Sequence, residues 1–235
     1  MVVKASIIQR ISAAADDLPT KFSPLEGGCI GDVFRVDLKH GGAIVAKVGE
    51  LGGGLAIEGM MLDYLARNSR LPVPQVLYAM DDLLVMSHID GGDALNPQSQ
   101  RHAAELLANL HGLTADQFGF PMDTLIGGLV QPNLWTDHWC EFFRDQRLLY
   151  MARQALDAGR LPRRLMRRIE SLAEKLETGI DDAAQPSLLH GDLWTGNVLC
   201  KGNQIAGFVD PAVYYGDAEI ELAFSTLFGT FGEPF

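Results

Sequence analysis

A short segment near the end of the chain constrains the fold more than any other part of it. Residues 190–197 read His-Gly-Asp-Leu-Trp-Thr-Gly-Asn, and residues 208–210 read Phe-Val-Asp. Between them, residues 198–209 form two apolar runs separated by a Gly-Asn pair, which predicts a β-hairpin. Such a hairpin would return Asp210 to the side of Asn197. The sequence therefore predicts a compact cluster of oxygen-bearing side chains.

This cluster has the composition expected of a site for phosphoryl transfer from ATP. Asp192 can accept the proton of an attacking hydroxyl, while Asn197 and Asp210 offer hard oxygens that hold Mg²⁺ on the phosphates. A simpler interpretation is a capped turn beside an unrelated strand end. The His-Gly pair and the second aspartate favour the catalytic interpretation over that structural one.

The same segment resembles the catalytic loop of small-molecule kinases in the protein-kinase-like fold, which have His-Gly-Asp where protein kinases have His-Arg-Asp. Together with Pro-Ala-Val-Tyr-Tyr-Gly-Asp at residues 211–217, it is similar to the fructosamine kinase family. The resemblance covers nearly the whole chain. It implies an α+β, two-lobed protein-kinase-like fold, with a small antiparallel-sheet N-lobe carrying one main helix and a mostly helical C-lobe. Because family members continue with further helices past residue 235, we expect the C-lobe to be truncated.

Composition limits the other possibilities. The 235 residues are 47% hydrophobic and 21% charged, enough for one ordinary domain or two small lobes around a cleft. A net charge of −11 argues against a nucleic-acid or anionic-membrane partner. Three widely spaced cysteines do not form a disulfide framework. With no signal peptide and no apolar stretch of about 18 residues, we expect a soluble, cytoplasmic protein.

Hydrophobic periodicity divides the chain near residue 90. The first part predicts a helix, three strands, a second helix and two more strands, and the second part is mainly helical. We therefore expect an ATP-clamping N-lobe at residues 1–90 and a catalytic C-lobe at residues 91–235. The helices are expected over residues 4–16, 56–69, 98–113, 135–158 and 163–178.

A lysine in the middle of an apolar strand is the strongest signal in the first part. Lys47 lies between Ala46 and Val48, where it is either an edge cation at the surface or, on the resemblance, the ligand of the α- and β-phosphates. Glu58, on the following helix, is its expected ion-pair partner. Glu50 is closer in sequence but lies on the wrong element for that role.

Two further segments are expected to contact the nucleotide. The glycine-rich residues 27–31 lie where kinase-like folds place a loop over the phosphates, although a plain hairpin turn is the alternative. The strand ending near residue 87 would be the hinge whose main chain bonds adenine. The residues expected to contact the nucleotide here are Gly28, Cys29, Ile30, Ser87, His88 and Ile89. Cys29 is either a redox-sensitive thiol or an inert small residue fitted to the turn.

Side chains around the predicted catalytic loop allow more than one role. Trp194 packs either against the sugar ring of a substrate or into the lobe interior. Asp217 either caps the next helix or contacts a cationic or hydroxylated substrate. His190 is expected to brace the loop without transferring protons. Glu221 is expected to bond the loop's main chain.

The resemblance implies an ATP- and Mg²⁺-dependent kinase that phosphorylates a sugar hydroxyl of a small-molecule or protein-linked ketosamine, a deglycation repair step. The protein would act as a monomer or weak dimer. Two alternatives stay open. One is another small-molecule kinase of the same fold, acting on an aminoglycoside or an amino alcohol. The other is a pseudokinase module that only binds nucleotide.

Overall fold

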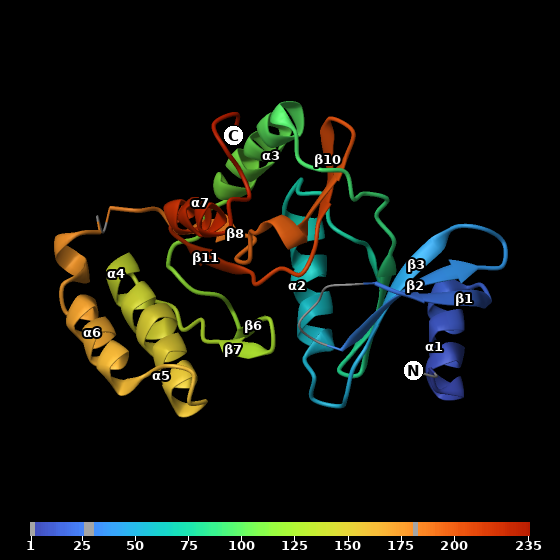
Figure 1. The fold of residues 1–235 in the computed structure, drawn as a ribbon, viewed down its shortest axis with the longest axis horizontal. Helices are drawn as coiled ribbons and strands as arrows, with labels where there is room; N and C mark the ends of the chain where they lie inside the picture. Colours follow the sequence, from blue (N-terminus) through green and yellow to red (C-terminus); the bar gives the residue numbers. More distant parts are fainter. Residues whose placement is uncertain (1–2, 26–30, 181–182) are drawn as a thin grey trace.

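The computed structural model describes residues 3–25, 31–180 and 183–235. An antiparallel sheet lies at one end of the molecule and a group of helices at the other (Figure 1). Helix α2, residues Leu55–Asn68, lies between them, against the sheet and beside the C-terminal half. This arrangement confirms the predicted α+β fold with an N-terminal sheet and a helical C-terminal part.

The sheet has five antiparallel strands in the order β1-β2-β3-β5-β4. The strands are β1 (Pro19–Pro24), β2 (Asp32–Leu38), β3 (Ala43–Val48), β4 (Val76–Met80) and β5 (Leu83–Ser87). Strand β3 is central, and its Lys47 lies opposite Val33 of β2 and Leu84 of β5. A central position buries Lys47, which excludes the surface-cation interpretation.

Each face of the sheet is covered by one helix. Side chains alternate between the faces of a strand, so Ala46 packs toward helix α1 (Ala5–Ala15), while Val45 packs toward α2. Gly59 allows α2 to lie close to β4, because a Cβ there would be 2.5 Å from the Cβ of Ala79. The close packing of α2 brings the side chain of the neighbouring Glu58 to Lys47 of β3.

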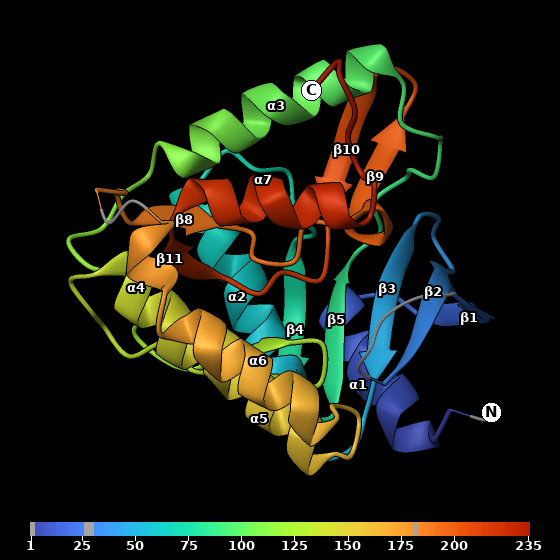
Figure 2. The ribbon, with the colours of Figure 1, turned by 60° about the vertical axis from the view of Figure 1, so that its left-hand side comes forward.

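The C-terminal part is built from helices and short two-stranded ribbons. Its α-helices are α3 (Pro97–His111), α4 (Trp139–Phe142), α5 (Tyr150–Asp157), α6 (Arg163–Ala173) and α7 (Ala218–Leu227). Its strands are β6 (Thr124–Ile126), β7 (Leu129–Gln131), β8 (Ser187–Leu189), β9 (Val198–Lys201), β10 (Gln204–Phe208) and β11 (Tyr214–Gly216). Figure 2 shows α3 and α7 on the same side of this part. Within the described ranges, no helix is long and apolar enough to cross a membrane.

Strands β9 and β10 form the predicted hairpin, closed at the Gly-Asn pair. Two predicted helices were wrong in detail. The helix expected over residues 135–158 begins at Trp139, and its middle, Phe143–Leu149, is π-helical. The widened turns place Gln146 and Arg147 inward together, where they bond the chain around residues 132–134. Likewise α6 ends at Ala173, followed by a 3₁₀ turn at Leu176–Thr178.

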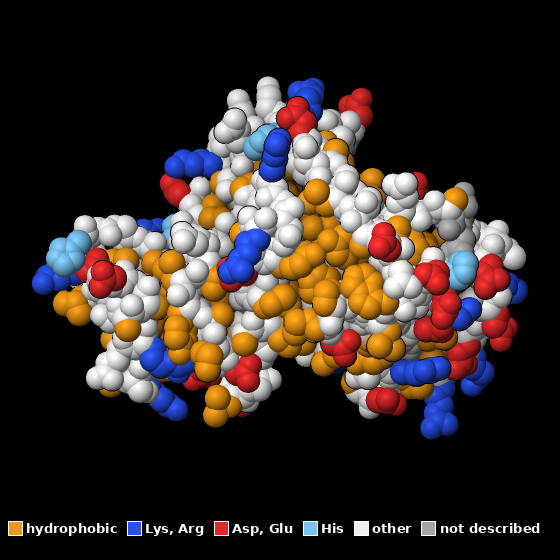
Figure 3. All heavy atoms as spheres, turned by 180° about the vertical axis from the view of Figure 1, so that it is seen from behind, with side chains coloured by type: hydrophobic (Ala, Val, Ile, Leu, Met, Phe, Trp, Pro, Cys, Tyr) orange, Lys and Arg blue, Asp and Glu red, His pale blue; other side chains and the backbone are white. Residues whose placement is uncertain are grey.

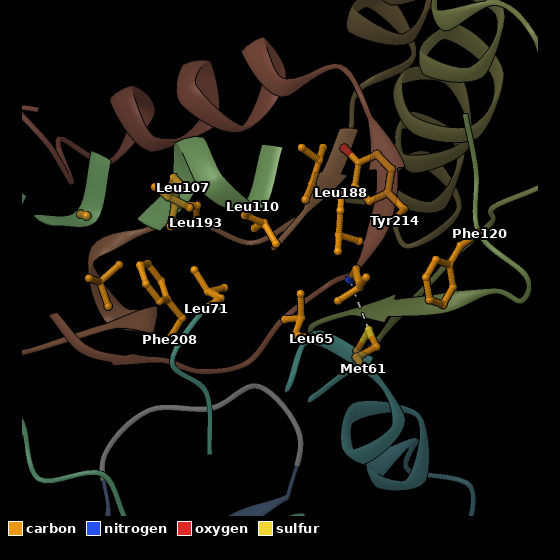
Figure 4. Close-up of a cluster of buried hydrophobic side chains, with 14 of the residues drawn as sticks. Met61, Leu65, Leu71, Leu107, Leu110, Phe120, Leu188, Leu193, Phe208 and Tyr214 are labelled. Atoms are coloured by element: carbon orange, nitrogen blue, oxygen red, sulfur yellow. Dashed lines mark hydrogen bonds between the residues drawn. The ribbon is translucent and has the colours of Figure 1, made fainter. Parts of the chain in front are cut away.

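The main hydrophobic core joins α2 to the C-terminal part. Met61 and Leu65 of α2 pack with Leu188 and Phe208, as Figure 4 shows. Hydrophobic side chains also gather across the middle of the face seen in Figure 3. Because one core includes residues from both halves of the chain, the position of α2 is coupled to that of the C-terminal strands.

Candidate active site

Three charged side chains from distant parts of the chain meet at the inner end of the sheet. The ammonium of Lys47 donates to the carboxylate of Glu58 at 2.7 Å and also to the carboxylate of Asp210. Lys47 and Glu58 are each about 95% buried, with exposed fractions of 4% and 5%. The predicted ion pair is therefore present, and Glu50 does not take its place.

Burial opposes the charge on Lys47, but its two carboxylate partners outweigh that effect. The pKa of the Lys47 ammonium is therefore raised above its ordinary value. A lysine held charged in this way keeps a fixed cation in the site throughout the neutral pH range. Such a cation suits the binding of phosphate oxygens.

Asn197 links the other two oxygen-bearing residues. Its side-chain amide donates to the main-chain carbonyl of Asp192 at 2.8 Å and to the Asp192 carboxylate at 2.9 Å. The same amide lies 3.4 Å from the carbonyl of Asp210, and the N–H of Val209 donates to the carbonyl of Asn197. The β9–β10 hairpin thus brings the three predicted residues together.

Partial burial changes the acidity of Asp192. Desolvation raises the pKa of its carboxyl to about 6, with smaller contributions from the nearby Asp210 and Glu221. The hydrogen bond from Asn197 opposes this shift. A carboxylate with a pKa near neutrality accepts a proton more readily than an ordinary aspartate, while it stays mostly ionised at pH 7.

His190 and Glu221 hold the loop at residues 190–197 in place. The ring of His190 donates through Nε2 to the carbonyl of Val209 at 3.1 Å and accepts through Nδ1 from the N–H of Asp192. Burial lowers the pKa of His190, consistent with this neutral tautomer. The Glu221 carboxylate accepts from the N–H of Gly191 at 2.6 Å and contacts His111 at 2.8 Å. Both residues therefore brace the loop, as predicted.

Asp210 has an unusual main-chain conformation. Its φ of 52° lies in the left-handed region, which few residues other than glycine adopt. Strain of this kind is found preferentially at functional sites, where the surrounding structure holds it in place. In this conformation the Asp210 carboxylate contacts Lys47 and lines the cleft.

The donor set fits a metal carried by a nucleotide rather than a metal held by protein alone. No group of three or more His, Cys, Asp or Glu side chains among the described residues could hold an ion. Magnesium, however, needs only one or two protein oxygens when phosphates and water supply the rest. The amide oxygen of Asn197 and the carboxylate of Asp210 are hard ligands of the required kind, and both line the cleft.

A cleft of about 520 Å³ opens beside these residues. Part of its lining is apolar and suits an aromatic base; the apolar residues include Leu25, Val33, Val45, Met86 and Leu199. The predicted hinge residues Ser87, His88 and Ile89 also line the cleft, as do the charged residues Lys47, Asp192 and Asp210. The apolar surface and the charged cluster therefore belong to one cavity.

The remaining predicted residues differ in position. Trp194 lines the cleft, is 39% exposed and lies 5.8 Å from the ring of Phe228. Asp217 is not among the residues lining the cleft; its side chain accepts from the N–H of Glu219 and caps α7. Gly28, Cys29 and Ile30 lie outside the described residues. The redox hypothesis for Cys29 therefore stays a prediction.

The β6–β7 hairpin lines one side of the site and was not predicted from the sequence. Leu125 and Gly127 of this hairpin line the cleft. Thr124 donates to the carbonyl of Val213 at 3.2 Å, and Gln131 donates to that of Ala212 at 3.0 Å. The signal available in the sequence was a Gly-Gly pair between short apolar runs, which is typical of a tight hairpin.

A buried arginine supports this hairpin. The guanidinium of Arg147 lies over the rings of Phe142 and Tyr214, at 4.5 and 4.0 Å from their centroids. It donates to the carbonyl of Pro132 and to the side-chain oxygen of Asn133, both at 2.6 Å. The sequence predicted only a helix over residues 135–158, so the polar role of Arg147 was not foreseen.

Comparison with known proteins agrees with this geometry. The model of the fructosamine kinase family matches residues 3–235 of the chain. The chain belongs to the fructosamine kinase family. Relatives include a protein assigned as a ketoamine kinase in Enterococcus faecium, 33% identical over 92% of this chain and 78% of its own length. Another is the chloroplastic protein-ribulosamine 3-kinase of Arabidopsis thaliana, 32% identical over 92% of this chain and 68% of its own length.

Solved structures of this kinase family have the same fold. A structure assigned as a fructosamine-3-kinase from Thermobifida fusca superposes with a TM-score of 0.86 at 30% identity, over 97% of this chain and 80% of that one. An ADP-bound aminoglycoside phosphotransferase superposes with a TM-score of 0.65 at 18% identity, over 97% of this chain and 80% of its own, which shows shared fold alone. As a member of the fructosamine kinase family, the protein is a phosphotransferase with an alcohol group as acceptor, and ATP is the donor implied by that family.

Proposed function

We propose that the protein transfers the γ-phosphoryl group of Mg²⁺-bound ATP to a sugar hydroxyl of a ketosamine, with the 3-hydroxyl as acceptor. Residues 1–90 clamp ATP and residues 91–235 carry the catalytic loop. The observation that best supports this proposal is that Lys47, Asp192, Asn197 and Asp210 line one cleft together with a set of apolar side chains. Family membership supports the acceptor class.

Each of these residues has a distinct proposed role. Lys47, held by Glu58, binds phosphate oxygens, and the apolar slot between Val33 and Leu199 holds adenine beside the hinge. Asp192 accepts the proton of the sugar hydroxyl as that hydroxyl attacks the γ-phosphorus. Positioning and charge neutralisation supply most of the rate, because phosphoryl transfer asks little covalent chemistry of the protein.

Asn197 and Asp210 would hold the magnesium ion. When bound, the ion neutralises charge on the phosphates. Asn197 also fixes the Asp192 carboxylate by its hydrogen bond, so one side chain would both position the base and bind the metal. Trp194, partly exposed at the mouth of the cleft, offers a flat apolar surface against which a sugar ring can pack.

The proposed acceptor is tested by measuring ADP formation with a panel of compounds. Fructosyl-lysine is expected to accelerate ATP consumption above a water blank and to gain one phosphoryl group, while kanamycin and choline are not. Unmodified lysine is the matched control, because it presents the same amine without the sugar. Faster turnover with kanamycin or choline would instead assign an aminoglycoside or amino-alcohol kinase. ATP binding without turnover on any acceptor would assign a nucleotide-binding module.

A further inference from the structure

Helix α2 is joined to the segment after Asp210 by two polar contacts. The N–H of Val213 donates to the sulfur of Met61 at 3.4 Å, drawn as a dashed line in Figure 4. About one turn along the helix, the hydroxyls of Tyr64 and Tyr215 lie 2.9 Å apart. Residues three apart are neighbours on a helix surface, so both contacts belong to one side of α2.

Along both α2 and the facing segment, these contacts follow the charged cluster of Lys47, Glu58 and Asp210. Glu58 precedes Met61 by three residues on the helix, and Asp210 precedes Val213 by three residues on the facing segment. Lys47 bonds to both Glu58 and Asp210 at one end of this pairing. The helix and the segment therefore lie side by side, joined first by the ion pairs and then by Met61 and the two tyrosines.

The surroundings of the two tyrosine hydroxyls favour a well-defined bond. The ring of Tyr64 meets that of Phe120 edge-on at 4.9 Å, and the ring of Tyr215 lies 6.3 Å from that of Trp135. Both tyrosines are partly buried. A hydrogen bond in apolar, low-dielectric surroundings is stronger than one in water, and its loss leaves a hydroxyl without its partner.

We propose that Tyr64 and Tyr215 are positioning residues that hold α2 against the Asp210 segment, so that Glu58 meets Lys47 before nucleotide binds. Without their bond, α2 samples positions in which Lys47 is no longer held for phosphate binding. ATP then binds only to the fraction of molecules in the correct arrangement, and its apparent Kd rises as that fraction falls.

The experiment compares Tyr64→Phe, Tyr215→Phe and the double variant by ATP-binding calorimetry, steady-state kinetics and thermal unfolding. Each single change is expected to raise the Kd and KM for ATP about 3- to 10-fold, which corresponds to the net free energy of one hydrogen bond. We expect kcat at saturating ATP to stay within about twofold, because ATP restores the arrangement. The double variant should equal the single variants, since all three lose the same bond.

Tyr78→Phe is the matched control. Its hydroxyl accepts from Arg10 at 3.3 Å on the α1 side of the sheet, so its removal should leave ATP affinity unchanged. A lower Tm with wild-type Kd and KM in the Tyr64 and Tyr215 variants would overturn the positioning role. Additive effects in the double variant would also overturn it. Because this inference rests on the proposed function, wild-type protein that binds no ATP would overturn that function instead.

Discussion

Asn197 donates from one side-chain nitrogen to both the main-chain carbonyl and the carboxylate of Asp192, at 2.8 and 2.9 Å. This double contact fixes the rotamer of Asp192. It uses only the side-chain nitrogen of Asn197, so the amide oxygen can still bind a metal ion. A carboxylate held in one orientation accepts a proton from a hydroxyl along a defined direction. The relationship explains why an Asp and an Asn five residues apart act as a unit.

Replacing Asp192 by Asn tests its role as proton acceptor. The variant keeps the shape of the side chain and an oxygen that can accept from Asn197, so the loop should stay folded. We expect turnover to fall by about 10²–10⁴-fold, with ATP affinity close to wild type. Turnover is measured as ADP release and affinity by calorimetry. Near-wild-type turnover would remove Asp192 from the mechanism.

The rate should depend on pH through the ionisation of Asp192. Its pKa is raised to about 6, and only the ionised form accepts a proton, so activity should be full above that pH and decline below it. We expect kcat/KM to fall about tenfold per pH unit on the acidic side. The residual activity of Asp192→Asn should lack this decline. A profile that is flat down to pH 5 in the wild type would contradict the assignment.

Replacing each of the two proposed metal ligands should weaken Mg²⁺-dependent ATP binding to a different extent. Asp210→Ala removes an anionic ligand and is expected to abolish Mg²⁺-dependent ATP binding. Asn197→Ala removes a neutral ligand and should weaken it less. Calorimetric titration of ATP with and without Mg²⁺ measures both effects. If the Asp210 variant keeps its dependence on Mg²⁺, the ion binds elsewhere.

Gly191 is expected to be intolerant of any side chain. Its φ is 86°, and a Cβ there would lie 1.9 Å from the carbonyl oxygen of Ala212. We expect Gly191→Ala to displace the catalytic loop and to reduce both Tm and turnover severely. Gly202→Ala is the matched control, with φ of 60° and open space around its Cβ. Gly202→Ala should lower the free energy of unfolding by only about 1 kcal/mol and leave the activity unchanged. Thermal unfolding measures the first effect and ADP release the second.

Much of the candidate site could be predicted from the sequence because several of its residues lie close together along the chain. Asp192 and Asn197 lie on one short loop, and the Gly-Asn turn of the β9–β10 hairpin fixes where Asp210 returns. Lys47 was singled out by its place in an apolar strand, although only the family resemblance implied its role in phosphate binding. Turn types and strand periodicity act over a few residues, so these features depend little on the rest of the chain.

Only the tertiary structure decided how the distant parts meet. Lys47 and Asp210 are 163 residues apart, and Met61 and Val213 are 152 apart, so each contact depends on how α2 packs against both the sheet and the C-terminal core. The role of Arg147 depends likewise on a π-helical segment that spacing did not reveal. Periodicity reports which face of an element is buried, but not what that face meets. The sequence by itself therefore determined the local groups of the candidate site, on the loop and hairpin at residues 190–210 and on the strand with Lys47. Long-range packing determined which of these groups touch and which further segments line the cleft.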